Sequence, residues 1–326
     1  MKNPVPAEDY SKLVDWRAEL ATKCATESVV ASHQIHELDI FRSDALIDLI
    51  DRYPRERLQV FTMGNDPLDR SQWQPVDTTG TSGADIMHAV KVGRLWVKLM
   101  RIDLFEDRFR DLVSGLHEEI GRRCPELSPL WLRPLLLISS PRALVYYHAD
   151  PQPTMLWQVS GSKRVWIYPA GDHALLRPDL LEQIYAGEID EEAPYEPEFD
   201  RYALVHDLTP GDLLAWPLNA PHRVSNHDSV NVSLSVPYGT HQAERRSQVY
   251  QANLYLRRRF RLRNLSTSEK GVGSFIKRNS FRVARRLGLT PAAGSTRDAY
   301  MANVRIDVSS PAGISRIPGD PVPTPF

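Results

Sequence analysis

The sequence predicts a mainly β protein whose core is an antiparallel sandwich or barrel. Between residues 135 and 238 it contains short apolar runs that are separated by proline and glycine turns. The last run alternates cleanly, with valine or leucine on one face and asparagine or serine on the other. Short strands in this succession are typical of an antiparallel β core. The runs expected to form strands are 135–139, 143–148, 154–159, 163–169, 202–208, 212–217 and 230–238.

The first 130 residues are expected to form a mixed, mostly helical region that packs on this barrel. Ser43 is expected to cap a helix over residues 44–53. Residues 55–92 are rich in turn signals and are expected to be mainly loops. A short strand is expected at 94–102 and a helix at 103–122, where five large apolar residues share one stripe. The domain boundaries drawn from these patterns are 1–130, 131–240 and 241–326.

The third region, 241–326, is basic and helical and ends in a proline-rich tail. A helix with a basic end is expected over 241–264. Between Arg245 and Arg286 there are 13 lysine or arginine residues and a single acid, Glu269. The final eleven residues, RIPGDPVPTPF, are expected to be an extended tail.

The composition is that of an ordinary globular chain. Of the 326 residues, 42% are hydrophobic and 25% charged, and the formal net charge is −1, so no global field indicates a nucleic-acid or membrane partner. The two cysteines, Cys24 and Cys124, are far apart, which argues against a disulfide framework or a zinc ribbon. The first residues contain no apolar signal segment, and no stretch approaches the length of a membrane span. These features predict a cytoplasmic protein without a membrane partner.

A histidine and an aspartate stand one residue apart at the end of an expected strand, as His148 and Asp150. Residues two apart in a strand share a face, so both side chains are expected to point the same way. Two histidines and one carboxylate form the facial triad that binds Fe(II) and leaves positions open for other ligands. The pair alone is weak evidence, because such pairs occur by chance, and a third ligand must come from a distant strand.

His222 is the best candidate for that third ligand among the ten histidines. It follows GDLLAWPLNAP, which reads as a strand and a proline-rich turn that opens the next strand. His227 is the nearest rival, but it lies in a polar segment expected to be an exposed turn. His206 lies in an expected strand, where a paired or solvent-facing role is favoured.

The segment HADPQPTMLWQVSGSKRVWIYP, followed by GDLLAWPLNAPH, resembles the jumonji-type, cupin-like Fe(II)- and 2-oxoglutarate-dependent oxygenases. It is most similar to their asparaginyl and lysyl side-chain hydroxylases, over about residues 131–240. The shared elements are H-x-D, then G-x-K-R before a strand that ends in proline, then G-D-x-L-x-x-P-x-x-x-x-H. The resemblance implies a double-stranded β-helix (a jelly-roll barrel) in which His148, Asp150 and His222 hold the iron. It also implies an O₂-dependent dioxygenase that hydroxylates a C–H bond, with 2-oxoglutarate as cosubstrate.

The same resemblance implies that Lys163 binds the distal carboxylate of 2-oxoglutarate, although strand-end lysines are usually solvated. A fixed ammonium in a partly dry pocket gives a charge-assisted hydrogen bond to a carboxylate. Relatives often add two hydroxyl groups at places that hold Trp96 and Val145 here. Three other residues are candidates to replace them near the cosubstrate, and these are Thr154, Tyr146 and Ser235. Tyr146 is expected to share the face of His148, with a packed core aromatic as its alternative reading.

The substrate suggested by the resemblance is a protein or peptide side chain. The acidic insertion 179–200 is expected to be a solvated excursion, but at the active-site mouth it would favour a basic substrate. A small-molecule hydroxylase and a cupin-type metal-binding protein without oxygenase activity remain alternatives.

The basic segment 245–286 allows a further reading, nucleic-acid binding through phosphate contacts. No recognisable nucleic-acid-binding motif accompanies it, so a solvated or partner-facing helix is favoured. Val249, Ala252, Leu256 and Phe260 have helical spacing and would form an apolar stripe beneath the charges. Relatives often dimerise through helices after the barrel, so we expect a homodimer through this C-terminal helix.

Overall fold

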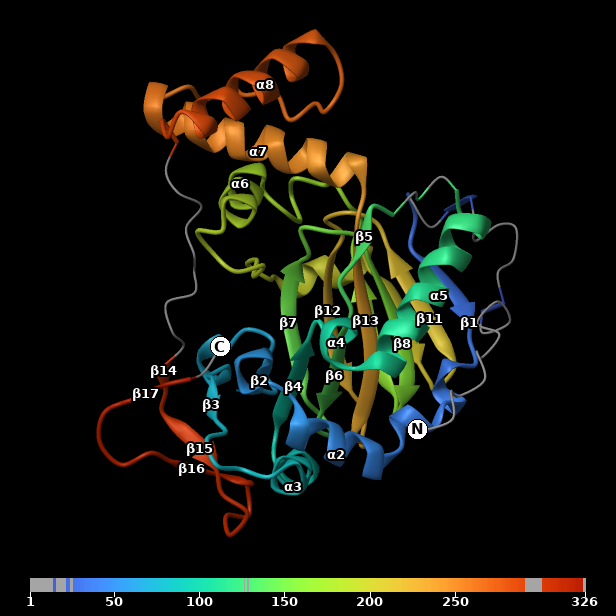
Figure 1. The fold of residues 1–326 in the computed structure, drawn as a ribbon. Helices are drawn as coiled ribbons and strands as arrows, with labels where there is room; N and C mark the ends of the chain where they lie inside the picture. The colour runs from blue at the N-terminus through green and yellow to red at the C-terminus, as the bar shows by residue number, and fades with distance from the viewer. Residues whose placement is uncertain are drawn as a thin grey trace.

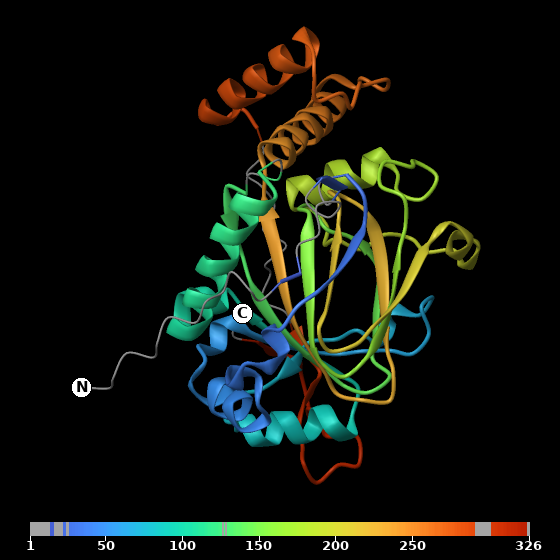
Figure 2. The same ribbon diagram turned by 90° about the vertical axis from the view of Figure 1, so that its right-hand side faces the viewer.

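The computed structural model describes residues 14–15, 22–23, 26–125, 127, 129–290 and 301–324. Two antiparallel sheets face each other at its centre (Figures 1 and 2). The larger sheet has the strand order β1-β11-β8-β13-β6-β4-β2, and β5 pairs with β13 at its side. Its strands are β1 (Val29–Ser32), β11 (Asp212–Trp216), β8 (Thr154–Ser160), β13 (Asn231–Gly239), β6 (Leu135–Ser139), β4 (Leu95–Met100), β2 (Leu58–Thr62) and β5 (Trp131–Leu132).

The smaller sheet has the order β10-β9-β12-β7. Its strands are β10 (Leu204–Leu208), β9 (Lys163–Ile167), β12 (Pro221–Asn226) and β7 (Leu144–Ala149). Apolar side chains from both sheets meet between them, among them Leu156, Val165 and Trp216. The architecture is a jelly-roll barrel, so the predicted fold class is confirmed.

A second and larger core lies on the outer face of the main sheet, where N-terminal helices cover it (Figure 1). Because side chains alternate along a strand, the two faces of β13 are buried in different places. Val232 and Leu234 pack outward against the helices, while the polar residues between them face the barrel interior. The covering helices are α2 (Ser43–Arg52), α3 (Gly83–Val92) and α5 (Asp107–Arg123), which follows the short α4 (Ile102–Phe105). The alternation predicted for residues 230–238 is confirmed, and both of its faces are buried.

The N-terminal region contributes more regular structure than the sequence indicated. Residues 55–92 were expected to be loops, but β2 and α3 lie there, so that expectation is wrong. The Ser82 hydroxyl caps α3 by accepting from the backbone N–H of Asp85, a signal hidden among the surrounding turn residues. Ser43 does not cap α2: it is the first helical residue, and Arg42 stands at the N-cap without a side-chain hydrogen bond.

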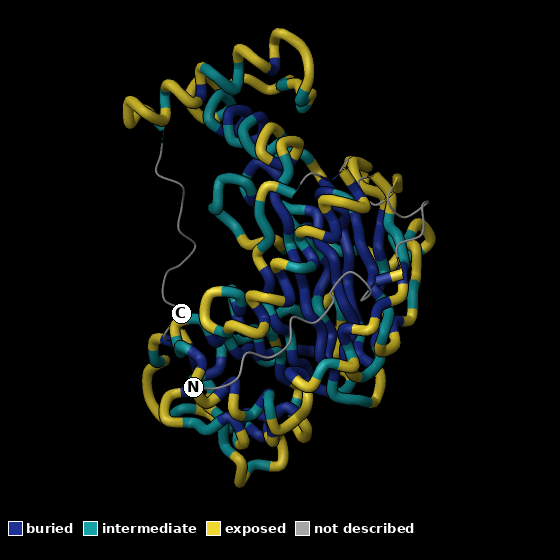
Figure 3. Tube along the Cα trace, turned by 45° about the vertical axis from the view of Figure 1, so that its right-hand side comes forward, coloured by how far each residue is buried: buried dark blue, intermediate teal, exposed yellow. Residues whose placement is uncertain are grey.

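The C-terminal region begins with α7 (His241–Phe260), which packs against α6 (Pro178–Ala186) and α8 (Val272–Arg286). These helices lie at one end of the barrel, and much of the α8 surface is exposed (Figure 3). The chain then returns to the N-terminal region, where β15 (Val304–Ile306) pairs with β3 (Val76–Asp77). Two more short strands, β14 (Met301–Ala302) and β16 (Ile314–Arg316), precede β17 (Val322–Pro323), so the tail is partly paired. The domain boundaries at 130 and 240 stay a prediction.

Within the described ranges, no helix is both long and apolar enough to cross a lipid bilayer.

Candidate active site

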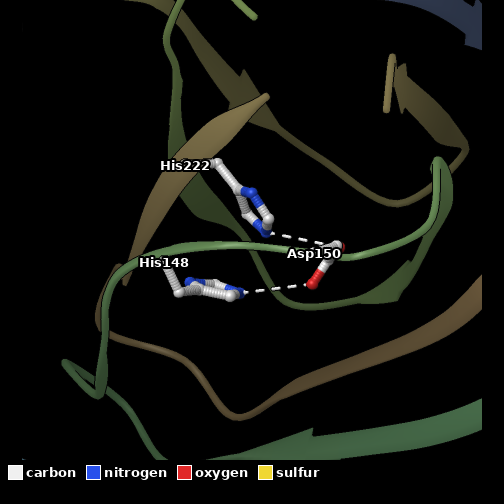
Figure 4. Close-up of side chains that lie close together, drawn as sticks. All are labelled: His148, Asp150 and His222. Atoms are coloured by element: carbon white, nitrogen blue, oxygen red, sulfur yellow. Dashed lines mark ion pairs between the residues drawn. The ribbon is translucent and has the colours of Figure 1, made fainter. Parts of the chain in front are cut away.

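His148, Asp150 and His222 converge at one end of the barrel (Figure 4). His222 on β12 lies opposite His148 on β7, and Asp150 follows β7 directly. One ligand atom from each residue lies within 4.8 Å of the other two. Each histidine Nε2 is 3.8 Å from an oxygen of Asp150, and the two imidazole centroids are 4.0 Å apart. Two imidazoles and one carboxylate at this spacing form the donor set of a facial triad.

Both histidines are oriented by their own backbone. The Nδ1 of His148 lies 2.7 Å from the carbonyl oxygen of Tyr146, and that of His222 lies 3.1 Å from the carbonyl of Ala220. Donation from Nδ1–H to a carbonyl leaves Nε2 as a lone-pair donor that points at Asp150. Burial, and then the neighbouring His222 ring, lower the pKa of His148 to about 3, so its imidazole is neutral and suited to a metal.

Two residues hold Asp150. The Thr154 hydroxyl donates to its Oδ2 at 2.9 Å, and the Asn219 amide donates to its backbone carbonyl at 2.9 Å. Asn219 has a φ of 61°, a left-handed conformation that asparagine tolerates better than most residues. The Tyr185 hydroxyl donates in turn to the Asn219 side chain at 2.9 Å. The sequence reasoning missed Asn219, although its position in the turn before His222 was a usable signal.

A cavity of about 660 Å³ extends from these three residues into the barrel, between the two sheets. Lys163 lines the cavity and is 5% exposed. On the paired strand β12, its neighbour Asn226 stands four residues from His222, about 13 Å along the strand. The triad and Lys163 therefore occupy different levels of one cavity.

Lys163 is a buried ammonium without an acidic partner in the part of the chain that the structure describes. Its Nζ donates to the Ser233 hydroxyl at 2.7 Å. Burial alone lowers the pKa of Lys163 to about 7. A buried cation with only a neutral partner is costly unless an anion joins it, so this end of the cavity is suited to a carboxylate.

A polar chain fixes the position of Ser233 inside the barrel. Its hydroxyl donates to Gln158 Oε1 at 2.7 Å, and Gln158 Nε2 donates to Asn231 Oδ1 at 2.8 Å. Nearby, the Asn226 amide donates to the Ser139 hydroxyl at 2.8 Å, and both of these residues line the cavity. The alternation of residues 230–238 had placed Asn231 and Ser233 on one face, but their contacts come from strands far away in the sequence.

A family model matches the part of the chain that contains the site. Residues 100–244 match the family model of the cupin-like domain, and this match contains all three triad residues and Lys163. Those residues form a cupin-like domain. No curated protein sequence matches the chain.

Solved structures similar to this chain include the Escherichia coli ribosomal oxygenase YcfD, with 14% identity and a TM-score of 0.44. A YcfD structure in complex with cobalt and 2-oxoglutarate has 14% identity and a TM-score of 0.43. In both, 82% of the chain is aligned and spans 64% of the YcfD chain. The DMSP lyase DddQ from Ruegeria pomeroyi has 14% identity and a TM-score of 0.22, over 34% of this chain and 40% of its own.

The remaining site candidates lie in different places of the cupin-like domain. Ser235 lines the cavity, as do Trp96 and Val145, which occupy the places where hydroxyl groups were expected. Thr154 contacts Asp150 directly and is absent from the cavity lining. Tyr146 lies elsewhere: its hydroxyl donates to the Asp69 carbonyl at 2.7 Å.

The expectation that Tyr146 shares the face of His148 is wrong, because a β-bulge interrupts the alternation. His222 lies opposite His148, but Val224 lies opposite Val145, so β7 contains one extra residue between these two pairs. Val145 and His148 therefore both face the cavity, while Tyr146 packs outward in an apolar cluster with Phe61 and others. The packed-aromatic reading holds for Tyr146.

Proposed function

We propose that this chain is a jumonji-type Fe(II)- and 2-oxoglutarate-dependent dioxygenase that hydroxylates a C–H bond of a protein or peptide side chain. The observation that carries this proposal is one cavity with two built ends. His148, Asp150 and His222 stand at one end, and at the other stands Lys163, which has no acidic partner among the described residues. A dicarboxylate that also chelates a metal fits such an arrangement.

The residues present fit the iron and its cosubstrate, and each has a defined task. Two imidazole nitrogens and one carboxylate would hold Fe(II) and leave positions on it for other ligands. Thr154 and Asn219 keep the Asp150 carboxylate in place. Lys163 binds the far carboxylate of 2-oxoglutarate, and Ser233 fixes the direction of its ammonium. Bound iron and 2-oxoglutarate would supply the oxidative chemistry that transfers oxygen from O₂ to carbon.

The walls of the cavity keep the reaction away from water. The Trp216 ring lies against His222, with centroids 4.5 Å apart, and the apolar Leu156 and Val224 line the cavity from its two sheets. Such a partly dry site strengthens the ion pair between Lys163 and a carboxylate.

The test is an anaerobic titration of the purified protein with Fe(II) and 2-oxoglutarate, followed by visible absorption. Wild type should show a weak metal-to-ligand charge-transfer band. His222→Ala should lose it, because one metal ligand is gone. Lys163→Ala should weaken it, because the cosubstrate loses its distal anchor. A folded wild-type protein that binds metal without giving the band would refute the 2-oxoglutarate assignment.

A second candidate is a cupin-type metal protein, or a small-molecule hydroxylase, that uses the same barrel. Trp96 and Val145 favour it, because both line the cavity where relatives of the resembled family place hydroxyl groups. Ser139, Ser235 and Asn226 line the same cavity and can replace those lost hydroxyls. The charge-transfer titration separates the oxygenase from the metal protein, and turnover of peptides against small molecules separates the two kinds of hydroxylase.

We also propose a homodimer through the C-terminal region and a cytoplasmic location. Val249 and Ala252 are buried within the chain, so only the later part of the expected α7 stripe is available to a partner. Phe260 is exposed, and α8 adds Phe275 and Ile276, both more than half exposed. An apolar surface of this kind supports an interface. The location rests on the sequence alone.

A basic substrate stays a prediction, which rests on the acidic 179–200 insertion lying at the active-site mouth. Glu191 of this insertion lines the cavity, but several of its other acids are paired. Arg257 pairs with Glu182, and Arg258 pairs with Glu188.

A further inference from the structure

Three arginines line the mouth of the cavity, at the same end of three neighbouring strands. Arg57 immediately precedes β2, Arg101 immediately follows β4, and Arg133 comes shortly before β6. The register places Leu58 opposite Leu99 and Met100 opposite Leu135. All three arginines therefore lie within about two residues of the level of Met100, on strands about 4.8 Å apart.

Two of the three guanidinium groups have no acidic partner among the described residues. Arg101 is engaged, because it makes a two-point hydrogen bond with Asp103 at 3.0 and 2.9 Å. Arg57 makes no ion pair, and Arg133 stacks on Trp131 with its Cζ 4.3 Å from the ring centroid. A stacked or half-buried guanidinium keeps its N–H donors for a planar anion.

The acids near the mouth do not satisfy these arginines. Glu56 and Glu191 line the cavity, but neither lies within ion-pair distance of Arg57 or Arg133. Glu191 interacts instead with Lys98, which also lines the cavity. The paired acids of the 179–200 insertion are held by arginines outside the mouth, which are Arg257, Arg258, Arg177, Arg70 and Arg223.

The strand registers show which residues lie near the mouth of the cavity and which lie deep inside it. Trp96, Lys98 and Met100 alternate into it along β4, and this run spans about 13 Å. Trp96 pairs with Ser139 at the deep, Lys163 end, whereas Met100 lies at the arginine end. On β13, Pro237 lies opposite Thr154, the partner of Asp150, so the triad is near the mouth. The lining residues at the arginine end are the more exposed ones, so a substrate that enters there passes the arginines before it reaches the metal.

We propose that the substrate carries a carboxylate near the hydroxylated carbon, and that Arg57 and Arg133 bind this carboxylate at the mouth. The inference rests on the proposed function for the identity of the reaction, but the anion site itself does not depend on it. The matching substrate is an acidic peptide segment, with an aspartate or glutamate close to the target residue. A small carboxylic acid would offer the same chemistry to the two arginines.

The test is fluorescence anisotropy with two labelled peptides, measured without iron or 2-oxoglutarate. One peptide alternates Asp or Glu with Ala, and the other has Lys or Arg in the same places. Wild type should bind the acidic peptide and prefer it over the basic one. Arg57→Ala and Arg133→Ala should each weaken that binding about threefold to fivefold, and the double variant about tenfold or more. Both side chains are partly or fully exposed, so circular dichroism of the variants should match wild type.

Arg201→Ala is the matched control, because Arg201 is also exposed and stacked on an aromatic ring, Tyr202, outside the cavity lining. It should leave binding unchanged. Displacement of the acidic peptide by N-acetylglutamate at similar concentration would keep the carboxylate site and assign it to a small acid. Tighter binding of the basic peptide, or equal binding of the acidic peptide by wild type and the double variant, would overturn the proposal.

The two proposals fail separately. Arginine-dependent binding of the acidic peptide without a charge-transfer band would refute the oxygenase and leave the anion site standing. A band without any preference for the acidic peptide would do the opposite.

Discussion

Lys163 is the residue on which the chemistry of the cavity depends most directly. It is almost fully buried, and among the described residues its Nζ has one hydrogen-bond partner, the Ser233 hydroxyl. Burial lowers the pKa of Lys163 to about 7. An unfolded lysine has a pKa near 10.4. The free protein therefore carries a penalty for a charged Lys163 that a bound carboxylate relieves.

The low pKa of Lys163 gives stability and cosubstrate affinity opposite dependences on pH. Between about pH 7 and pH 10 the unfolded chain binds more protons than the folded one at this residue, so the stability of the ligand-free protein should rise with pH. Over the same range the affinity for 2-oxoglutarate should fall, because the carboxylate needs the charged ammonium. Calorimetric titration at several pH values measures this affinity. In Lys163→Met the decline above pH 7 should be absent, and a decline as steep as in wild type would contradict the prediction.

Thr154 does not touch the metal site itself, but its hydroxyl donates a hydrogen bond to the proposed metal ligand Asp150. Thr154→Val removes the hydroxyl that donates to Oδ2 and keeps the volume of the side chain. The carboxylate can then rotate, and metal affinity should fall roughly tenfold to a hundredfold. Competition with a chelator for Co(II) measures this loss. Thr78→Val is the control, because that buried hydroxyl has no hydrogen-bond partner among the described residues. Equal metal affinity in both variants would sink the assignment of Thr154.

At the scale of elements, two ion pairs of very different burial join α7 to α6 and to the loop that follows α6. The Glu182 carboxylate is 1% exposed and receives hydrogen bonds from Arg257 at 3.0 Å, twice. The Glu188 carboxylate, paired with Arg258, is more exposed, as is its arginine. A buried carboxylate that loses its partner is costly, whereas an exposed pair contributes little.

Arg257→Ala should therefore lower the free energy of unfolding by about 3 kcal/mol. Arg258→Ala, the matched change one residue further along, should lower it by less than about 1 kcal/mol. Urea denaturation followed by circular dichroism measures both. Adding Glu182→Gln to Arg257→Ala should recover part of the loss, because the buried charge is then removed. Similar losses in the two arginine variants would contradict the argument from burial.

At the scale of the whole molecule, local sequence patterns predict some elements of the structure and miss others. Periodicity located most of the barrel strands, and the motifs around His148 and His222 located the triad. Local signals failed for β2, whose pairing partner β4 lies far along the chain, and for α3, where turn residues hid the cap at Ser82. The bulge in β7 and the contact between Lys163 and Ser233 also depend on strands brought together only by the fold.

The proposed dimer is a property at this scale. The mass of one chain is 37.1 kDa, and sedimentation equilibrium should give twice that mass for wild type. Phe275→Asp with Ile276→Asp places charge on the exposed face of α8 and should give monomers that unfold as wild type does. Val308→Asp is the control, because Val308 is also exposed but lies away from α8, between β15 and β16. A monomeric wild-type protein would refute the proposal.

The extra residue in β7 has a consequence for how this protein could lose its metal. Strand alternation on either side of the bulge is out of phase, and His148 faces inward only because of that one-residue offset. One more residue in β12 between His222 and Val224 would restore regular pairing with β7 and, with Val145 still facing inward, would turn the His148 imidazole out of the barrel. All three ligands would still be present in the sequence. A descendant of this fold could therefore keep the H-x-D motif in full and yet be unable to bind a metal, a loss that motif searches would not detect.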